Sequence, residues 1–175
     1  MRTSIYATCL SWLRMVEQII DINFVKELLS QIPDPEIPVI NIVELGIVRD
    51  IVILNSNTIE VTITPTYSAC PAMFSIEEDI LKLFSEKGIK VDVKTKIAPA
   101  WTTDWITDEA REKLRNYGIV PPEKGNVENS FGLAKPCPRC QSSDTRQLSR
   151  FGSTLCKASY VCNNCLEPFD YFKCH

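Results

Sequence analysis

Four of the chain's eight cysteines form two pairs whose spacing is typical of a metal site. CPRC at 137–140 and CNNC at 162–165 are separated by 21 residues. Two such turns supply the four thiolates of a closed tetrahedral zinc site. Two alternatives are an iron–sulfur cluster, which four thiolates can also hold, and a redox dithiol formed by a CxxC pair. However, the residues between the two pairs fit the small hairpins of a zinc ribbon. We therefore expect a structural Zn²⁺ bound by Cys137, Cys140, Cys162 and Cys165.

Three further potential ligands lie in the same tail, namely Cys156, Cys174 and His175. One interpretation is that Cys156 packs as a small hydrophobic residue and that the terminal Cys-His is solvated. The other is a second soft-metal or cluster site with three ligands and an open position. Both interpretations remain open from the sequence.

Another cysteine, Cys70, stands directly before a proline in the stretch TPTYSACPAM. Proline is favoured as the first helical residue, so we expect Cys70 to be a helix N-cap with its sulfur facing unpaired N–H groups. Such a thiol ionises more readily and is a better soft-metal ligand than a buried one. The alternative is an inert cysteine that only caps the helix, although cysteine caps less well than Ser, Thr, Asp or Asn.

Two carboxylates in the proline-rich DPEIP loop, Asp34 and Glu36, are candidates to lie near Cys70. Together the three residues could contact a metal cluster. On local sequence alone, the two carboxylates could equally be solvated loop residues.

The elements that must position these residues are predicted by their apolar periodicity. We expect a helix at 22–32, strands at 46–54 and 58–64, a helix from Cys70 to Lys87-Gly88, and a strand at 89–94. This α-β-β-α-β order predicts an α+β domain with a small mixed sheet. A further helix should run from about Thr107 to Gly118.

The cysteines and the charges both divide the chain into two parts. We expect an N-terminal extension at 1–21, the α+β domain at 22–120, a linker at 121–135 and the cysteine-rich, zinc-ribbon-like domain at 136–175. The first 134 residues carry 13 basic and 19 acidic side chains, and the last 41 carry 6 and 3. Four zinc-bound thiolates would remove most of the tail's positive charge, which argues against nucleic acid binding.

Composition indicates a cytoplasmic protein. We find no secretory signal and no apolar stretch of the roughly 18 residues that a membrane span requires. Eight cysteines without an export signal favour metal or thiol chemistry over a disulfide framework.

Two stretches carry a resemblance to a known family. DPEIPVINIVELGIV followed by TPTYSACPAM resembles the small domain of the iron–sulfur cluster assembly family, which includes SufT-like and cytosolic cluster-targeting factors. The added APAWTTDW segment, the tail with FGSTLCKA and the ending EPFDYFKCH resemble one branch, the accessory subunits of the phenylacetyl-CoA oxygenase, a ring 1,2-epoxidase. The resemblance covers residues 22–175.

This resemblance implies a non-enzymatic factor in aerobic phenylacetate degradation that assists iron–sulfur or iron-centre assembly in the epoxidase. The family's reactive cysteine and loop aspartate correspond to Cys70 and Asp34. The implied partners are the epoxidase subunits, including the iron–sulfur reductase component, and a cluster would be bound transiently or at the second site. The alternatives are a structural oxygenase subunit without turnover of its own and, less favoured by the charge, a zinc-ribbon protein that binds nucleic acid.

Overall fold

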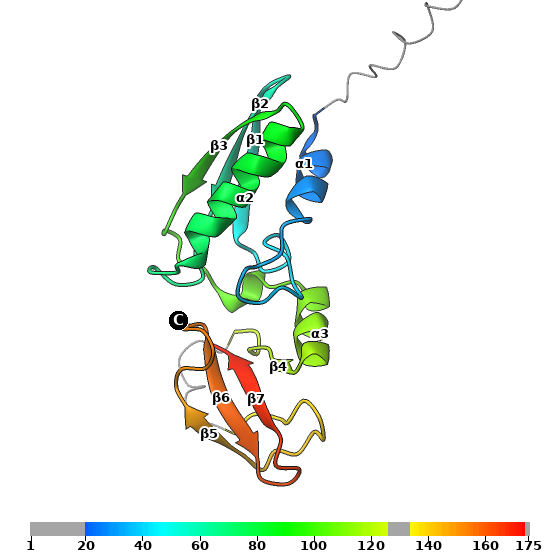
Figure 1. Cartoon of the computed structure of the whole chain (residues 1–175), viewed down its shortest axis with the longest axis vertical. Helices are drawn as coiled ribbons and strands as arrows, with labels where there is room; N and C mark the ends of the chain where they lie inside the picture. The colour runs from blue at the N-terminus through cyan, green and yellow to red at the C-terminus, as the bar shows by residue number, and fades with distance from the viewer. Residues whose placement is uncertain (1–19, 126–133, 174–175) are drawn as a thin grey trace, which may run out of the picture.

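The computed structural model describes residues 20–125 and 134–173. In these two segments the chain forms a three-stranded sheet and a four-stranded sheet, which lie one beyond the other along the long axis of the molecule (Figure 1). The predicted Cys174 and His175 lie outside the described residues.

The first sheet has two helices packed with it. Its elements are α1 (Ile22–Leu29), β1 (Val48–Asn55), β2 (Thr58–Ile63), α2 (Ala72–Glu86) and β3 (Lys90–Thr95). β1 and β2 form an antiparallel hairpin, and α2 carries the chain across so that β3 runs parallel to β2. The predicted α-β-β-α-β order and the mixed sheet are confirmed.

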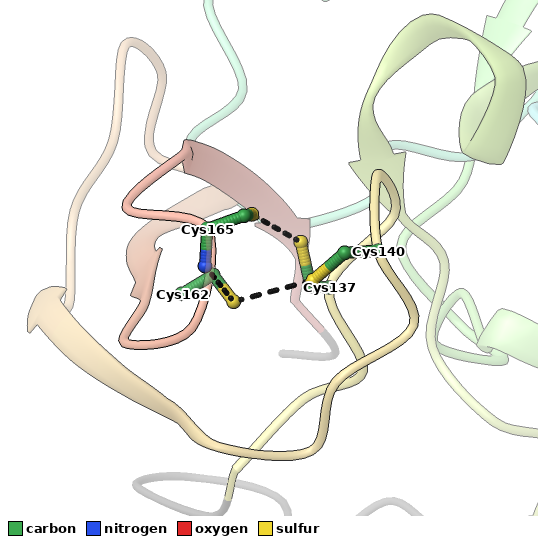
Figure 2. A group of neighbouring side chains, drawn as sticks. All are labelled: Cys137, Cys140, Cys162 and Cys165. Carbon is green, nitrogen blue, oxygen red and sulfur yellow. Dashed lines mark hydrogen bonds between the residues drawn. The ribbon is translucent and has the colours of Figure 1, made fainter.

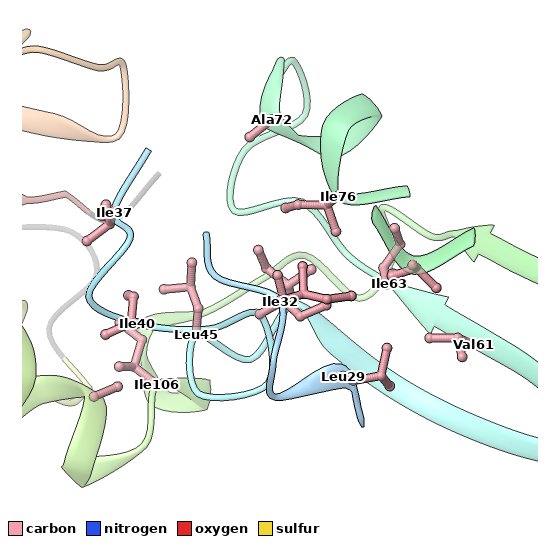
Figure 3. Packing of buried hydrophobic residues seen from close by; sticks show 14 of the residues in the cluster. Leu29, Ile32, Ile37, Ile40, Leu45, Val61, Ile63, Ala72, Ile76 and Ile106 are labelled. Atoms are coloured by element: carbon pink, nitrogen blue, oxygen red, sulfur yellow. The ribbon is translucent and has the colours of Figure 1, made fainter. Parts of the chain in front are cut away.

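Apolar side chains from β2, α1 and α2 meet in the core of this first part. Figure 3 shows Leu29, Val61, Ile63 and Ile76 within one cluster, and each of them is 0% exposed. Burying a side chain of this size contributes roughly 1.5–3 kcal/mol relative to leaving it in water. This core anchors the start of α2, where Cys70 lies.

α1 ends at Leu29, earlier than the predicted end at residue 32. The N–H groups of Gln31 and Ile32 bond to the carbonyls of Leu28 and Leu29, which is a tighter turn than an α-helix makes. Pro33 follows and cannot continue the helix. Ile32 nevertheless stays buried, so the apolar stripe was predicted correctly although the last turn was not.

A short 3₁₀ turn, η1 (Thr103–Trp105), leads into α3 (Asp108–Tyr117). Thr107 caps this helix by accepting the N–H of Ala110, and Gly118 ends it in the left-handed conformation. Both ends agree with the prediction. The longest helix described, α2, has 15 residues, and none of the described helices is long and apolar enough to cross a membrane.

The four cysteines of the two CxxC pairs lie at one end of the second sheet, and of these only Cys162 is part of a strand. Its strands are β4 (Ile119–Val120), β5 (Thr145–Ser149), β6 (Lys157–Cys162) and β7 (Pro168–Phe172), in the order β4-β7-β6-β5. β5, β6 and β7 are antiparallel neighbours, while β4 runs parallel to β7. The chain therefore enters the second sheet directly from α3.

The two sheets share part of one core. Phe172 at the end of β7 is 1% exposed and belongs to the first sheet's cluster. Its ring meets the edge of Trp101 with 5.9 Å between centroids, and the Trp101 Nε1 donates to the Leu45 carbonyl at 3.0 Å. Trp101 thus joins the end of the second sheet to the loops of the first.

Gly46 occupies a position that only glycine fits. Its φ is +74°, and a Cβ added there would lie 2.6 Å from the Cβ and 2.7 Å from the carbonyl oxygen of Trp105. We expect Gly46→Ala to lower the free energy of unfolding by more than the roughly 1–2 kcal/mol that left-handed geometry alone costs. Urea unfolding measures this loss.

Gly88→Ala is the matched control for Gly46→Ala. Gly88 has φ +70°, but no described atom lies within 4 Å of the added Cβ. The control should therefore show only the cost of the backbone conformation. If both variants lose the same free energy of unfolding, the close approach of Trp105 to Gly46 does not add to the cost of a side chain there.

Candidate functional site

The Asp-Pro-Glu loop is held in shape by the buried carboxylate of Asp34. Its Oδ1 accepts the backbone N–H groups of Glu36 at 2.9 Å and Ile37 at 2.8 Å. Burial raises the pKa of Asp34, and the two N–H donors partly offset this rise. Asp34 thus bonds within the loop, whereas the half-buried Glu36 extends its side chain away from it.

Cys70 lies one residue further from α2 than predicted. The helix begins at Ala72 with Pro71 as its N-cap, so the prediction that Cys70 is the N-cap is wrong. The reason is that the Cys70 carbonyl closes a tighter turn by accepting the N–H of Met73 at 3.4 Å. The Cys70 sulfur still accepts the N–H of Ala72, so it faces the start of the helix.

The prediction that the Cys70 thiol ionises readily is also wrong, because its pKa is raised rather than lowered. Burial raises the pKa of Cys70, and the negative charges of Glu36 and Asp34 add to the rise. A hydrogen bond from the Ala72 N–H favours the thiolate but does not reverse the direction of the pKa shift. In the metal-free protein Cys70 is therefore a protonated thiol at neutral pH, which binds metal only with loss of its proton.

Glu36, Tyr67 and Cys156 complete the surroundings of Cys70. The Cys156 thiol, which comes from the second sheet, donates to the Glu36 Oε2 at 3.3 Å. Burial raises the pKa of Tyr67, and the negative charge of Glu36 raises it further. We call Cys70, Glu36, Tyr67 and Cys156 the junction group, because they gather where the two sheets meet.

A cavity of about 380 Å³ opens beside the loop that carries Tyr67. The cavity is lined by residues 65–69 together with Ile97, Ala100 and Trp101. Ile97 is 66% exposed. A largely apolar surface thus lies next to the loop that leads into Cys70.

The four cysteines of the CxxC pairs face one another at the end of the second sheet (Figure 2). Their sulfurs all lie within 4.8 Å of one another, with Cys137–Cys165 at 3.7 Å and Cys140–Cys162 at 3.6 Å. Tetrahedral sulfurs about 2.3 Å from a single ion would be about 3.8 Å apart. The donor set and its spacing therefore fit one four-coordinate metal ion.

The two CxxC turns are built alike. Each is followed by a residue with φ of 62°, Gln141 after the first and Leu166 after the second. The N–H groups of these residues donate to the carbonyls of Cys137 and Cys162, respectively. A hydrogen bond from the Ser142 backbone N–H lowers the pKa of Cys140, whereas the pKa of the neighbouring Cys165 is raised, so the four thiols share their protons unequally.

The remaining predicted ligands are separate from this group. Cys156 is buried and lies against Glu36, while Cys174 and His175 are outside the described residues. Sequence reasoning missed Tyr67 and the approach of Cys156 to Glu36. Tyr67 stands three residues before Cys70 and could have been noticed, but no local pattern relates Cys156 to residues 120 positions away.

Two family models match the chain. Residues 23–84 match the model described as "Iron-sulfur cluster assembly protein", and residues 123–173 match the "PaaD zinc beta ribbon domain". The first span includes the Asp-Pro-Glu loop and Cys70, and the second includes both CxxC pairs and Cys156.

Similar proteins span both parts or the first part alone. A candidate 1,2-phenylacetyl-CoA epoxidase subunit from Escherichia coli is 49% identical over 84% of this chain and 89% of its own. An Fe-S protein maturation auxiliary factor from Porphyromonas gingivalis is 36% identical over 50% of this chain and 84% of its own. A crystal structure of a domain of unknown function from Bacillus anthracis is 28% identical, with a TM-score of 0.49, and covers 53% of this chain and 89% of that one.

Proposed function

The chain belongs to the PaaD family of 1,2-phenylacetyl-CoA epoxidase subunits, and we propose that it assists assembly of that epoxidase's iron or iron–sulfur centres. In this proposal it acts in the cytoplasm during phenylacetate degradation, as a non-catalytic maturation factor. Its clients are the other epoxidase subunits, including the iron–sulfur reductase component.

One observation carries this proposal, the position of Cys70 beside the Asp-Pro-Glu loop. Both features fall within the span that matches the iron–sulfur cluster assembly model. A thiol next to carboxylates offers soft and hard ligands to iron. Because Cys70 is only partly buried and stays protonated until metal arrives, it can take up and release iron rather than retain it.

We assign the four-thiolate group a different role, that of a structural zinc site. The zinc ribbon model covers Cys137, Cys140, Cys162 and Cys165, and the sulfur spacing supports a single tetrahedral ion. Four protein ligands leave no open position for substrate. When bound, the zinc would stabilise the second sheet and thereby hold Phe172 and Cys156 against the first.

The name of the Escherichia coli relative favours a second possibility, that the chain is a permanent subunit of the oxygenase. The two roles predict different results when the chain is separated from the epoxidase after assembly. For a maturation factor, we expect epoxidase assembled in the presence of this chain to keep its iron and its activity after the chain is removed by affinity chromatography.

Epoxidase made without the chain is the necessary comparison in this experiment. It should contain less iron and regain none of its activity when purified chain is added without iron. If adding the chain alone restores activity, or if removing it after assembly abolishes activity, the chain is a permanent subunit and the maturation proposal fails.

A further inference from the structure

Cys156 belongs to the second sheet by sequence, but its sulfur lies in the core of the first. It precedes β6, is 4% exposed, and groups with the first sheet's cluster. Its Sγ lies 3.3 Å from the Glu36 Oε2 and 3.0 Å from the Thr154 Oγ1. A cysteine that only fills space needs no carboxylate at its sulfur, and partial burial of that carboxylate costs desolvation energy. Packing alone therefore does not explain the Cys156–Glu36 contact.

Cys70, just before the start of α2, lies within electrostatic reach of the same carboxylate. The Tyr67 side chain lies within electrostatic reach of Cys70, Glu36 and Cys156. The buried Lys157 Nζ donates to the Glu36 carbonyl at 3.3 Å, which brings a positive charge to the same place. Two thiols and one carboxylate from three separate segments thus surround one region.

We propose that Cys70, Glu36 and Cys156 bind one divalent transition-metal ion between the two sheets and leave a fourth position open. Two thiolates and a carboxylate suit zinc-like ions and ferrous iron. Both thiol protons would pass to solvent on binding. The three anionic ligands then exceed the charge of the ion by one, and the ammonium of Lys157 offsets this excess.

The junction site is looser than the ribbon site. Among the described residues only the four ribbon sulfurs form a group of ligand atoms that all lie within 4.8 Å of one another. Because Cys156 already contacts Glu36, metal binding must bring the Cys70 side chain closer to these two residues. An open and loosely held site suits an ion that is passed on. The junction site rests on the proposed function only for the identity of its physiological ion, ferrous iron.

The test is anaerobic titration with Co²⁺ of full-length protein that carries one equivalent of Zn²⁺, which fills the complete four-thiolate site of the ribbon; the thiolate charge-transfer absorption of Co²⁺ reports its ligands. Zinc binds such sites more tightly than cobalt, so the ribbon keeps its zinc. We expect one equivalent of Co²⁺ to bind with thiolate absorption. Cys156→Ala, Cys70→Ala and Glu36→Gln should each weaken binding more than the roughly 10- to 100-fold that loss of an outer-shell partner costs.

Two controls and a folding measurement complete the design. Thr154→Ala removes a neighbour of the Cys156 sulfur but no ligand, and Cys174→Ala removes a thiol outside the proposed site, so both should keep the bound cobalt. Thermal unfolding checks each variant, and Cys156→Ser replaces Cys156→Ala if the latter does not fold. Undiminished binding in a folded Cys156 variant, or loss of binding in Cys174→Ala, would overturn the site.

The junction site and the proposed function can fail separately. If Cys156→Ala abolishes cobalt binding while epoxidase made without this chain has its full iron content, the site stands and the function fails. If Cys156→Ala leaves cobalt binding intact while Cys70→Ser still yields iron-deficient epoxidase, the function stands and the site is wrong.

Discussion

Cys140→Ser is expected to remove the metal ion from the second sheet and to unfold that sheet. Structural zinc contributes roughly 10–16 kcal/mol in small zinc-binding peptides, which is as large as the whole stability of a typical domain. The apolar core around the ribbon is small and includes two of the metal ligands themselves, Cys137 and Cys162. Without the ion, this core cannot hold the strands together.

The first sheet should remain folded in Cys140→Ser but melt at a lower temperature. Its own core does not need the ribbon, yet it loses the buried Phe172 and the contact of that ring with Trp101. Calorimetry with zinc analysis measures both effects.

Arg139→Ala is the control for Cys140→Ser, because it changes the same CPRC turn without removing a ligand. Arg139 is exposed and pairs with Glu167, and an exposed ion pair of this kind contributes little stability. The control should keep its zinc and its unfolding transition. Unchanged metal content and an unchanged transition in Cys140→Ser would show that the four thiols are not a structural site.

The second large effect is expected from Cys70→Ser, in a bacterial host that lacks its own copy of this factor. Serine is nearly the same size as cysteine, and its hydroxyl can accept the Ala72 N–H that the sulfur now accepts. The variant should therefore fold with a melting temperature close to that of the parent. A hydroxyl cannot replace a thiolate as an iron ligand at neutral pH, so the host should fail to grow on phenylacetate.

Ser68→Ala is the matched control for the growth experiment. Ser68 is exposed in the same loop and has no role in the junction group. Hosts that produce Ser68→Ala should grow normally on phenylacetate, and all hosts should grow normally on a carbon source that does not require the epoxidase. A general growth defect, or equal defects in both variants, would contradict a specific role for the Cys70 sulfur.

The sequence predicted features that depend on local interactions. Thr107 and Gly118 mark the ends of α3 because capping and left-handed geometry have strong residue preferences. The two CxxC turns were identifiable for a similar reason, since each brings two sulfurs to one point within four residues. The mixed sheet followed from the order of its elements.

Features that depend on tertiary packing were predicted poorly. The prediction that the Cys70 thiol ionises readily was wrong, because the effect of burial on its pKa outweighs the effect of the helix N-terminus. The burial of a side chain cannot be deduced from its nearest neighbours in the sequence. Cys156 was considered only with ligands close to it along the chain. Its place beside Glu36 follows from how Phe172 and Trp101 join the two sheets, which no periodicity encodes.

The iron content of the epoxidase tests the central claim most directly. Epoxidase is purified from hosts that produce the parent chain, Cys70→Ser or Ser68→Ala, and iron is measured per oxygenase and per reductase component. We predict full iron content with the parent and with Ser68→Ala, and a clear deficit in at least one component with Cys70→Ser. Full iron content in both components with a folded Cys70→Ser would contradict the claim that this chain delivers iron through Cys70.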